Sequence, residues 1–232
     1  MNPTRCPLSQ LEIRLAEQWV HARLHATTLT IFGELDCAAL NDLHDQVASA
    51  FRMKYGSDLG LTPFLVKAAA RGLSHVPCMM NRIEGDECVT AATADIAVEI
   101  AGASGRFQPV VRDCGHLAIP DLAAALRDLS DKAEAGTLTL PELQGGVMTL
   151  MCYGPDGPDN STPALSAPQS AALAIHPVRQ RPAARDGEVA IRPMARIALS
   201  YNARIIPTAD AAAFLSAFCQ ALQSPVGLLL DA

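Results

Sequence analysis

Few residues of this 232-residue chain could carry acid–base chemistry. Histidine is the side chain best suited to take up a proton near neutral pH. Of the six histidines, five are expected at or near the surface, on helices, just after one, or in a loop: His21, His25, His44, His75 and His116. His176 follows a strand pattern and is the one candidate for a partly buried base.

The seven cysteines offer little metal or nucleophile chemistry. They are scattered, with no C-x-x-C pair and no close Cys/His spacing of the kind that binds zinc, so we expect no metal site. A nucleophilic Cys152 would need an exposed, electropositive environment. A packed cysteine in a strand is the simpler interpretation.

Composition narrows the class of protein. The net charge is −6 and there is no basic run, which argues against binding to nucleic acid. No apolar stretch reaches the roughly 20 residues of a membrane span, and the opening residues do not resemble a signal peptide, so a cytoplasmic protein is expected. Only 18% of residues are charged, which favours burial of some surface against other copies.

The elements that must position the candidate residues alternate between helical and strand patterns. Apolar spacing predicts helices over 8–24, 38–55, 62–74, 117–135 and 209–222. Strands are predicted over 28–36, 79–83, 96–100, 108–111, 147–152, 170–175, 178–181 and 188–201, with a hairpin turn at Arg185-Asp186-Gly187. Residues 153–169 read as an exposed loop. We therefore expect residues 1–232 to form one α/β domain.

Motifs along the whole chain resemble the catalytic domain of the dihydrolipoyl acyltransferases of 2-oxoacid dehydrogenases, a branch of the chloramphenicol acetyltransferase superfamily. Thr62-Pro63-Phe64-Leu65-Val66-Lys67-Ala68 is similar to the family's T-P-F-L-V-K-A helix, and Pro109-Val110-Val111-Arg112-Asp113 to P-V-I-R-D. Gln144-Gly145-Gly146-x-x-Thr149 resembles Q-G-G-T-F-T. Residues 199–206 stand where the family has L-S-Y-D-H-R-V-I.

This resemblance implies the fold and the assembly. The expected fold is a chloramphenicol acetyltransferase-like two-layer sandwich, with helices packed on a large mixed sheet. The family forms trimers whose active sites lie between subunits, so a homotrimer is expected. The implied donor is acetyl-CoA. Its pantetheine arm is expected near Ser166, Pro168 and Gln169, at the end of the strand 147–151.

The same resemblance marks the catalytic positions and shows where this chain departs from them. The family's general-base histidine corresponds to Ala203, flanked by Asn202 and Arg204. Its oxyanion serine corresponds to Met151, with Thr149 as a nearby substitute hydroxyl. The pair that follows the histidine becomes Pro207-Thr208. The chain as written is therefore expected to be inactive or impaired, and Ala203 is either a natural loss or an introduced replacement of histidine.

The predicted native activity is CoA-dependent transfer of an acetyl group to a hydroxyl of a small-molecule or carrier-bound acceptor. The sequence leaves no room for the family's lipoyl domain, so no lipoyl group is expected on this chain. A specialised polyketide or tetronate pathway is the expected setting, by analogy with stand-alone relatives. Two alternatives stay open: an inactive structural subunit of a 2-oxoacid dehydrogenase-type assembly, and a catalyst that uses another base for a different thioester reaction.

Overall fold

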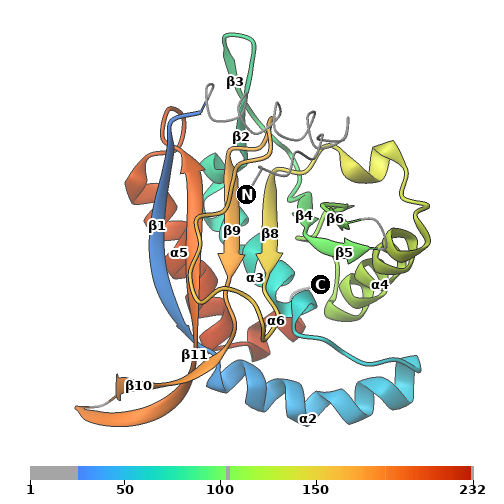
Figure 1. Ribbon diagram of the computed structural model, residues 1–232, viewed down its shortest axis with the longest axis vertical. Helices are drawn as coiled ribbons and strands as arrows, with labels where there is room; N and C mark the ends of the chain where they lie inside the picture. Colours follow the sequence, from blue (N-terminus) through green and yellow to red (C-terminus); the bar gives the residue numbers. More distant parts are fainter. Residues whose placement is uncertain (1–25, 103–104, 186, 231–232) are drawn as a thin grey trace, which may run out of the picture.

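A seven-stranded mixed sheet is the centre of the computed structural model, which describes residues 26–102, 105–185 and 187–230. Its strands are β1 (Thr28–Asp36), β4 (Ile96–Val98), β7 (Val110–Val111), β8 (Met148–Cys152), β9 (Ala171–Ile175), β10 (Arg179–Arg185) and β11 (Glu188–Asn202). They run in the order β1-β11-β9-β8-β4-β7, and β10 pairs with β11 (Figure 1). The β4–β8 and β8–β9 pairs are parallel and the others antiparallel.

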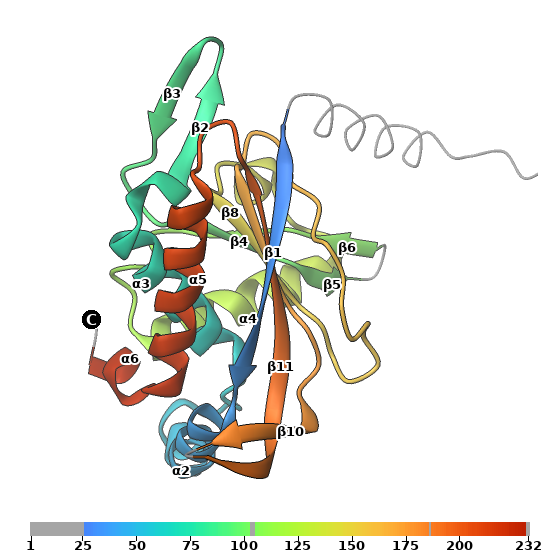
Figure 2. The same cartoon turned by 90° about the vertical axis from the view of Figure 1, so that its left-hand side faces the viewer.

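The helices cover one face of this sheet and form the second layer. They are α2 (Ala38–Tyr55), α3 (Thr62–His75), α4 (Ile119–Ala135), α5 (Thr208–Gln223) and α6 (Val226–Leu230), with short 3₁₀ turns η1 (Pro77–Met80) and η2 (Leu140–Leu143). In Figure 2, α3 and α5 lie side by side on one side of β1 and β11, and the connection from β8 to β9 runs over the other side. Gly72 allows the close approach of α3 and α5, because a Cβ there would meet the Phe214 ring at 2.9 Å.

Two faces of the sheet follow from the alternation of side chains along its strands. Leu150, Leu173 and Leu199 point to the helices and belong to the main hydrophobic core. Met151, Ala174 and Ala198 form a separate buried cluster, which Tyr153 adjoins. This second face, covered by the β8–β9 connection, carries the candidate functional residues.

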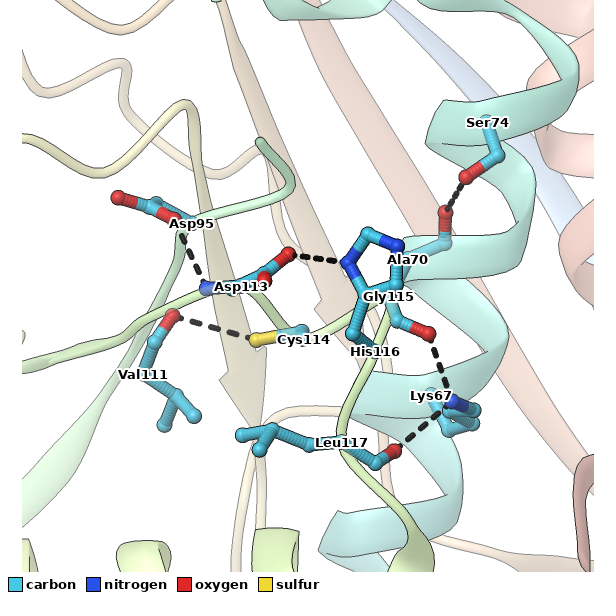
Figure 3. Close-up of polar contacts among 10 residues, drawn as sticks. All are labelled: Lys67, Ala70, Ser74, Asp95, Val111, Asp113, Cys114, Gly115, His116 and Leu117. Carbon is cyan, nitrogen blue, oxygen red and sulfur yellow. Dashed lines mark hydrogen bonds and ion pairs between the residues drawn. The ribbon is translucent and has the colours of Figure 1, made fainter. Parts of the chain in front are cut away.

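A buried lysine joins α3 to the segment that leads into α4 (Figure 3). Lys67 is 2% exposed and its Nζ donates to the carbonyl oxygens of Gly115 and Leu117, both at 2.8 Å. A buried ammonium group needs such acceptors, because leaving it unpaired would cost several kcal/mol, on the order of the desolvation penalty of an ion. Lys67 therefore fixes the loop between β7 and α4 rather than facing the candidate site.

Most predicted elements are present with shifted ends, and three differences have a physical cause. The strand predicted over 96–100 is interrupted, and β5 (Ile100–Gly102) pairs with β6 (Gly105–Phe107) in a separate ribbon. β10 continues through Pro182, which an edge strand tolerates because no ladder hydrogen bond is lost on its open side. No helix is predicted beyond residue 222, but the short helix α6 follows directly after Pro225, where a missing N–H costs nothing.

Other parts of the predicted pattern differ in detail. The segment predicted as a strand over 79–83 is η1 followed by the hairpin of β2 (Asn81–Glu84) and β3 (Glu87–Thr90), which stands at the top of Figure 1. The predicted helix over 8–24 and the turn residue Asp186 lie outside the described residues. None of the helices in the described part of the chain is long and apolar enough to cross a membrane.

Candidate functional site

The turn that follows β11 holds the position of the expected base. Backbone bonds define it: Ile205 N–H and Ile206 N–H both donate to the carbonyl of Asn202, at 3.2 and 3.0 Å, and Ala203 N–H donates to Thr27 at 2.9 Å. The side chain of Asn202 is 5% exposed, and its Oδ1 accepts the N–H of Arg204 at 3.2 Å. Ala203 contributes only a methyl group, which cannot accept a proton.

The two elements joined by this turn are also linked by a side-chain bond. Tyr201 is fully buried, and its hydroxyl donates to Thr208 Oγ1 at 2.9 Å, which connects the end of β11 to the first residue of α5. A buried phenol needs such a partner. The turn is therefore closed by the residues on either side of Ala203, and none of these bonds uses the Ala203 side chain.

Thr149 and Gln169 form the polar part of the neighbouring region. Thr149 is fully buried on β8, and its hydroxyl donates to Gln169 Oε1 at 2.6 Å. The Gln169 amide nitrogen would lie 3.1 Å from a Cβ at position 146, which explains the glycine there. Thr149 is thus the hydroxyl that orients Gln169, and its single proton is already engaged.

A pocket of about 390 Å³ brings several of the predicted residues together. Its lining includes Pro168, Gln169, Asn202 and Arg204, together with Ile83 and Gly85 of the β2–β3 hairpin. Ser166 does not line the pocket; its hydroxyl donates to Gln108 Oε1 at 2.8 Å and steadies the loop behind Pro168. The residues predicted for donor binding and the turn predicted for catalysis therefore share one pocket.

Met151 lies elsewhere on the same face. It is 7% exposed and sits opposite Ala174, which pairs in turn with Ala198. Met151, Ala174 and Ala198 therefore lie at one level across the sheet, which we call the Met151 row. Ala198 precedes Asn202 by four positions on β11, so the Met151 row and Asn202 are about 13 Å apart at roughly 3.3 Å per residue. Within one copy of the chain, Met151 and Ala203 do not form a common site.

A hydroxyl–imidazole pair lies next to Met151, and sequence patterns did not find it. His176 is 1% exposed; its Nε2 is 2.9 Å from Ser161 Oγ, and its Nδ1 is 3.0 Å from the carbonyl oxygen of Arg196. Tyr153 stacks on the imidazole, with ring centroids 5.4 Å apart. His176 was considered as a possible base, but nothing in the sequence linked it to a serine 15 positions earlier in an irregular loop.

The other candidate nucleophiles and ligands are poorly suited to chemistry. Burial, followed by the charge of Glu99, raises the pKa of the Cys152 thiol to about 12, so the reactive thiolate is scarce near neutral pH. The His116 side chain is 83% exposed and contacts Asp113 at the surface. Among the described residues, no group of three or more His, Cys, Asp or Glu side chains could hold a metal ion.

Comparisons with known proteins agree on one family. The family model for 2-oxoacid dehydrogenases acyltransferase (catalytic domain) matches residues 1–230. The chain is 35% identical over 227 residues to the dihydrolipoyllysine-residue succinyltransferase component of the 2-oxoglutarate dehydrogenase complex of Escherichia coli, covering 98% of this chain and 56% of that protein. The chain thus spans little more than half of that relative's length.

Solved structures agree with the fold. A dihydrolipoamide acetyltransferase of Azotobacter vinelandii, studied for the role of a serine, a histidine and an asparagine in its catalytic mechanism, superposes with a TM-score of 0.90 at 25% identity. The superposition covers 98% of this chain and 94% of that one. A chloramphenicol acetyltransferase is a distant structural neighbour, with a TM-score of 0.50 at 17% identity over 90% of this chain and 92% of that one. The predicted fold class is confirmed.

These relatives correct the predicted function. Transfer of an acetyl group to a hydroxyl in a polyketide or tetronate pathway is wrong, because the curated relatives are succinyltransferase components of the 2-oxoglutarate dehydrogenase complex. The predicted pathway rested on an analogy with stand-alone relatives and on the altered motif, and neither of them identifies the acyl group or its acceptor. The comparisons do not single out a purely structural subunit either.

Proposed function

Because the chain belongs to the family of 2-oxoacid dehydrogenase acyltransferase catalytic domains, we propose that it binds CoA thioesters and exchanges the acyl group with a dihydrolipoyl thiol. Succinyl is the proposed acyl group, since the curated relatives named above are succinyltransferases; acetyl-CoA is the donor to compare with it. Residues 1–232 act in this proposal as one domain in the cytoplasm.

One observation carries the proposal: a single pocket is lined by both the predicted donor segment and the turn at the predicted catalytic position. Gln169, held by Thr149, presents an amide that can bind the amide groups of a pantetheine arm. Asn202 and Arg204 line the same pocket, and the Asn202 N–H donates to the carbonyl of Ser170 next to Gln169, so the thioester end of the arm would approach this turn. The pocket volume of about 390 Å³ suits part of an extended ligand rather than all of CoA.

The chemistry of this chain alone is proposed to be slow. Attack by a thiol on a thioester is accelerated when a base removes the thiol proton, and a positioned base contributes about 100- to 10,000-fold. Ala203 cannot supply that base. Met151 has no hydroxyl to donate to the oxyanion, a loss that typically costs about 100- to 1000-fold. Binding and orientation of the two thiols are what the remaining residues supply.

The site is proposed to be completed by a second copy of the chain. Within one copy the Met151 row lies about 13 Å along β11 from the Asn202 turn. A homotrimer in which the Met151 face of one subunit meets the Ala203 turn of the next would bring them together. The low fraction of charged residues, 18%, supports burial of surface between copies.

The experiment restores the missing base. We expect Ala203→His to increase succinyl transfer from succinyl-CoA to dihydrolipoamide by about 100-fold or more, because the imidazole can accept the thiol proton. Thiol release and succinyl-dihydrolipoamide formation are both measured. The matched control is Ala164→His, which adds the same imidazole at an exposed alanine of the β8–β9 loop and should leave the rate unchanged.

Calorimetric titration with CoA and light scattering accompany the kinetics. Binding of CoA and a trimeric mass are expected for the unchanged chain and for both variants. If folded, CoA-binding Ala203→His transfers succinyl no faster than the unchanged chain, the proposed acyl exchange at this turn is refuted. A stable monomer at micromolar concentration would refute the composite site.

A further inference from the structure

The second face of the sheet carries a complete hydroxyl–imidazole–acceptor arrangement away from the Ala203 turn. The carbonyl oxygen of Arg196 can only accept, so the Nδ1 of His176 that faces it at 3.0 Å carries the proton. The Nε2 of the neutral ring then holds a lone pair, and Ser161 Oγ, 2.9 Å away, must donate to it. This is the arrangement in which a serine is activated by a base that a third group orients.

The imidazole is fixed in place from several sides. The Arg196 carbonyl also accepts the backbone N–H of His176 at 2.9 Å, so the backbone and the ring are held by the same oxygen. Tyr153 stacks on one side of the ring, and the side chain is 1% exposed. A base held this firmly loses little entropy when it takes part in a reaction.

Ser161 is accessible to solvent, in contrast to His176. It is partly exposed and lies between the exposed residues Asn160 and Thr162. A pocket of about 260 Å³ is lined by Asn160, the residue before Ser161, and by Arg196, whose carbonyl holds His176, so space for a small acyl group lies at the neighbours of the pair. The Tyr153 hydroxyl lies 3.5 Å from Ser161 Oγ, and the serine's single proton belongs to the closer His176 nitrogen.

The pair is also close to the position of the missing oxyanion hydroxyl. Met151 faces Ala174, and His176 is two positions further along on the same face, about 7 Å away at roughly 3.3 Å per residue. The chain thus has no base at residue 203 and no hydroxyl at residue 151. It does have an imidazole and a hydroxyl side by side, in His176 and Ser161, about two residues along the sheet from Met151.

We propose that Ser161, with His176 as its general base, is an acyl-accepting nucleophile that hydrolyses acyl thioesters. Ser161 Oγ attacks the thioester carbonyl carbon, and its proton passes to His176 Nε2. The C–S bond breaks, and the imidazolium gives the proton to the departing thiolate. His176 then takes a proton from water, whose oxygen attacks the acyl-serine, and Ser161 leaves with that proton restored. One thioester and one water yield one carboxylic acid and one thiol.

For CoA thioesters this inference rests on the proposed CoA binding, so the experiment uses two donors. Succinyl-CoA tests the site with the nucleotide, and S-acetyl-N-acetylcysteamine, a short thioester without the nucleotide, tests it independently. The readouts are thiol release without an added acceptor and mass spectrometry of the acid-quenched peptide that contains Ser161. We expect an acyl group on Ser161 and hydrolysis of both donors by the unchanged chain.

Substitutions at Ser161 and His176 distinguish a nucleophilic role of Ser161 from a purely structural one. Ser161→Ala and His176→Gln should lower thiol release by about 100-fold or more and abolish the acyl-peptide. Thr162→Ala is the matched control, since Thr162 is the neighbouring exposed hydroxyl residue of the same loop, and it should change neither readout. Ser161→Cys keeps a nucleophile beside His176 and should still be acylated, which covers the case in which the alanine variant does not fold.

The outcomes distinguish this inference from the proposed function. If CoA binds and Ala203→His transfers succinyl, but Ser161 is never acylated by either donor, the nucleophile is refuted and the acyl exchange stands. If CoA does not bind but the short thioester acylates Ser161, the exchange proposal fails and the nucleophile stands. Equal hydrolysis by the unchanged chain and Ser161→Ala would refute the inference outright.

Discussion

Gln169, which Thr149 holds in place, lines the same pocket as Asn202 and Arg204 of the Asn202–Ile206 turn, yet different interactions hold the two regions. The first depends on side chains: Thr149 donates to Gln169, and Gly146 leaves space for the Gln169 amide. The second depends on backbone bonds to the Asn202 carbonyl and to Thr27. A region of the first kind changes shape when a side chain changes, whereas a region of the second kind keeps its backbone hydrogen bonds when the residue at position 203 changes.

This contrast predicts that a side-chain change in the Thr149–Gln169 region lowers the stability of the protein markedly. Thr149→Val keeps the shape of a fully buried side chain but removes its hydroxyl, leaving Gln169 Oε1 without its donor. We expect a loss of about 1–3 kcal/mol in the free energy of unfolding, the usual cost of an unsatisfied buried group. Urea denaturation measures it. Thr162→Val, at an exposed position of the adjoining loop, should cost almost nothing.

The turn should tolerate a comparable change better. Asn202→Ala removes the Oδ1 acceptor of the Arg204 N–H but leaves the bonds from Ile205 and Ile206 to the residue 202 carbonyl. We expect a loss of about 1 kcal/mol, the net value of one hydrogen bond, measured by the same denaturation. A loss larger than that of Thr149→Val would show that the side chain of Asn202, not the backbone, builds the turn.

The smallest expected effect is a loss of stability at low pH, which should act on the Thr149–Gln169 region through Asp95. Burial raises the pKa of Asp95, but the hydrogen bonds from the Asp113 N–H and Arg112 outweigh it and lower the pKa below its usual value. A lowered folded-state pKa means stability that is present above the unfolded-state value near 4 and lost as pH falls below it. Arg112 also donates to the carbonyl of Gln144, two positions before Gly146, so loss of the Asp95–Arg112 pair is expected to affect the Thr149–Gln169 region as well.

The measurement is the free energy of unfolding from pH 5 down to pH 3, with Asp95→Asn as the comparison. The variant should start less stable and lose less over this interval. Parallel pH profiles for the two proteins would contradict the assignment of the acid sensitivity to Asp95.

Four residues of the pocket lining could be singled out from the sequence because they belong to continuous motifs, whereas the contribution of the β2–β3 hairpin could not. Pro168 and Gln169 follow a recognisable loop, and Asn202 and Arg204 end a long apolar strand. The Ser161–His176 pair could not be predicted, because it joins a turn-rich loop to the end of β9 and depends on which imidazole nitrogen carries the proton. The β5–β6 ribbon was missed for another reason: three-residue strands show too little alternation to be recognised.

The hydrogen bond between Tyr201 and Thr208 has a consequence for how this chain can evolve. It closes the turn from outside, and no hydrogen bond of the turn uses the side chain at position 203, whose methyl group packs against the edge of the main core. A change of residue there therefore affects stability through that packing alone, while it can alter the chemistry of the site directly. A histidine at 203 would have to fit this packing, but no hydrogen bond of the turn would have to be rebuilt.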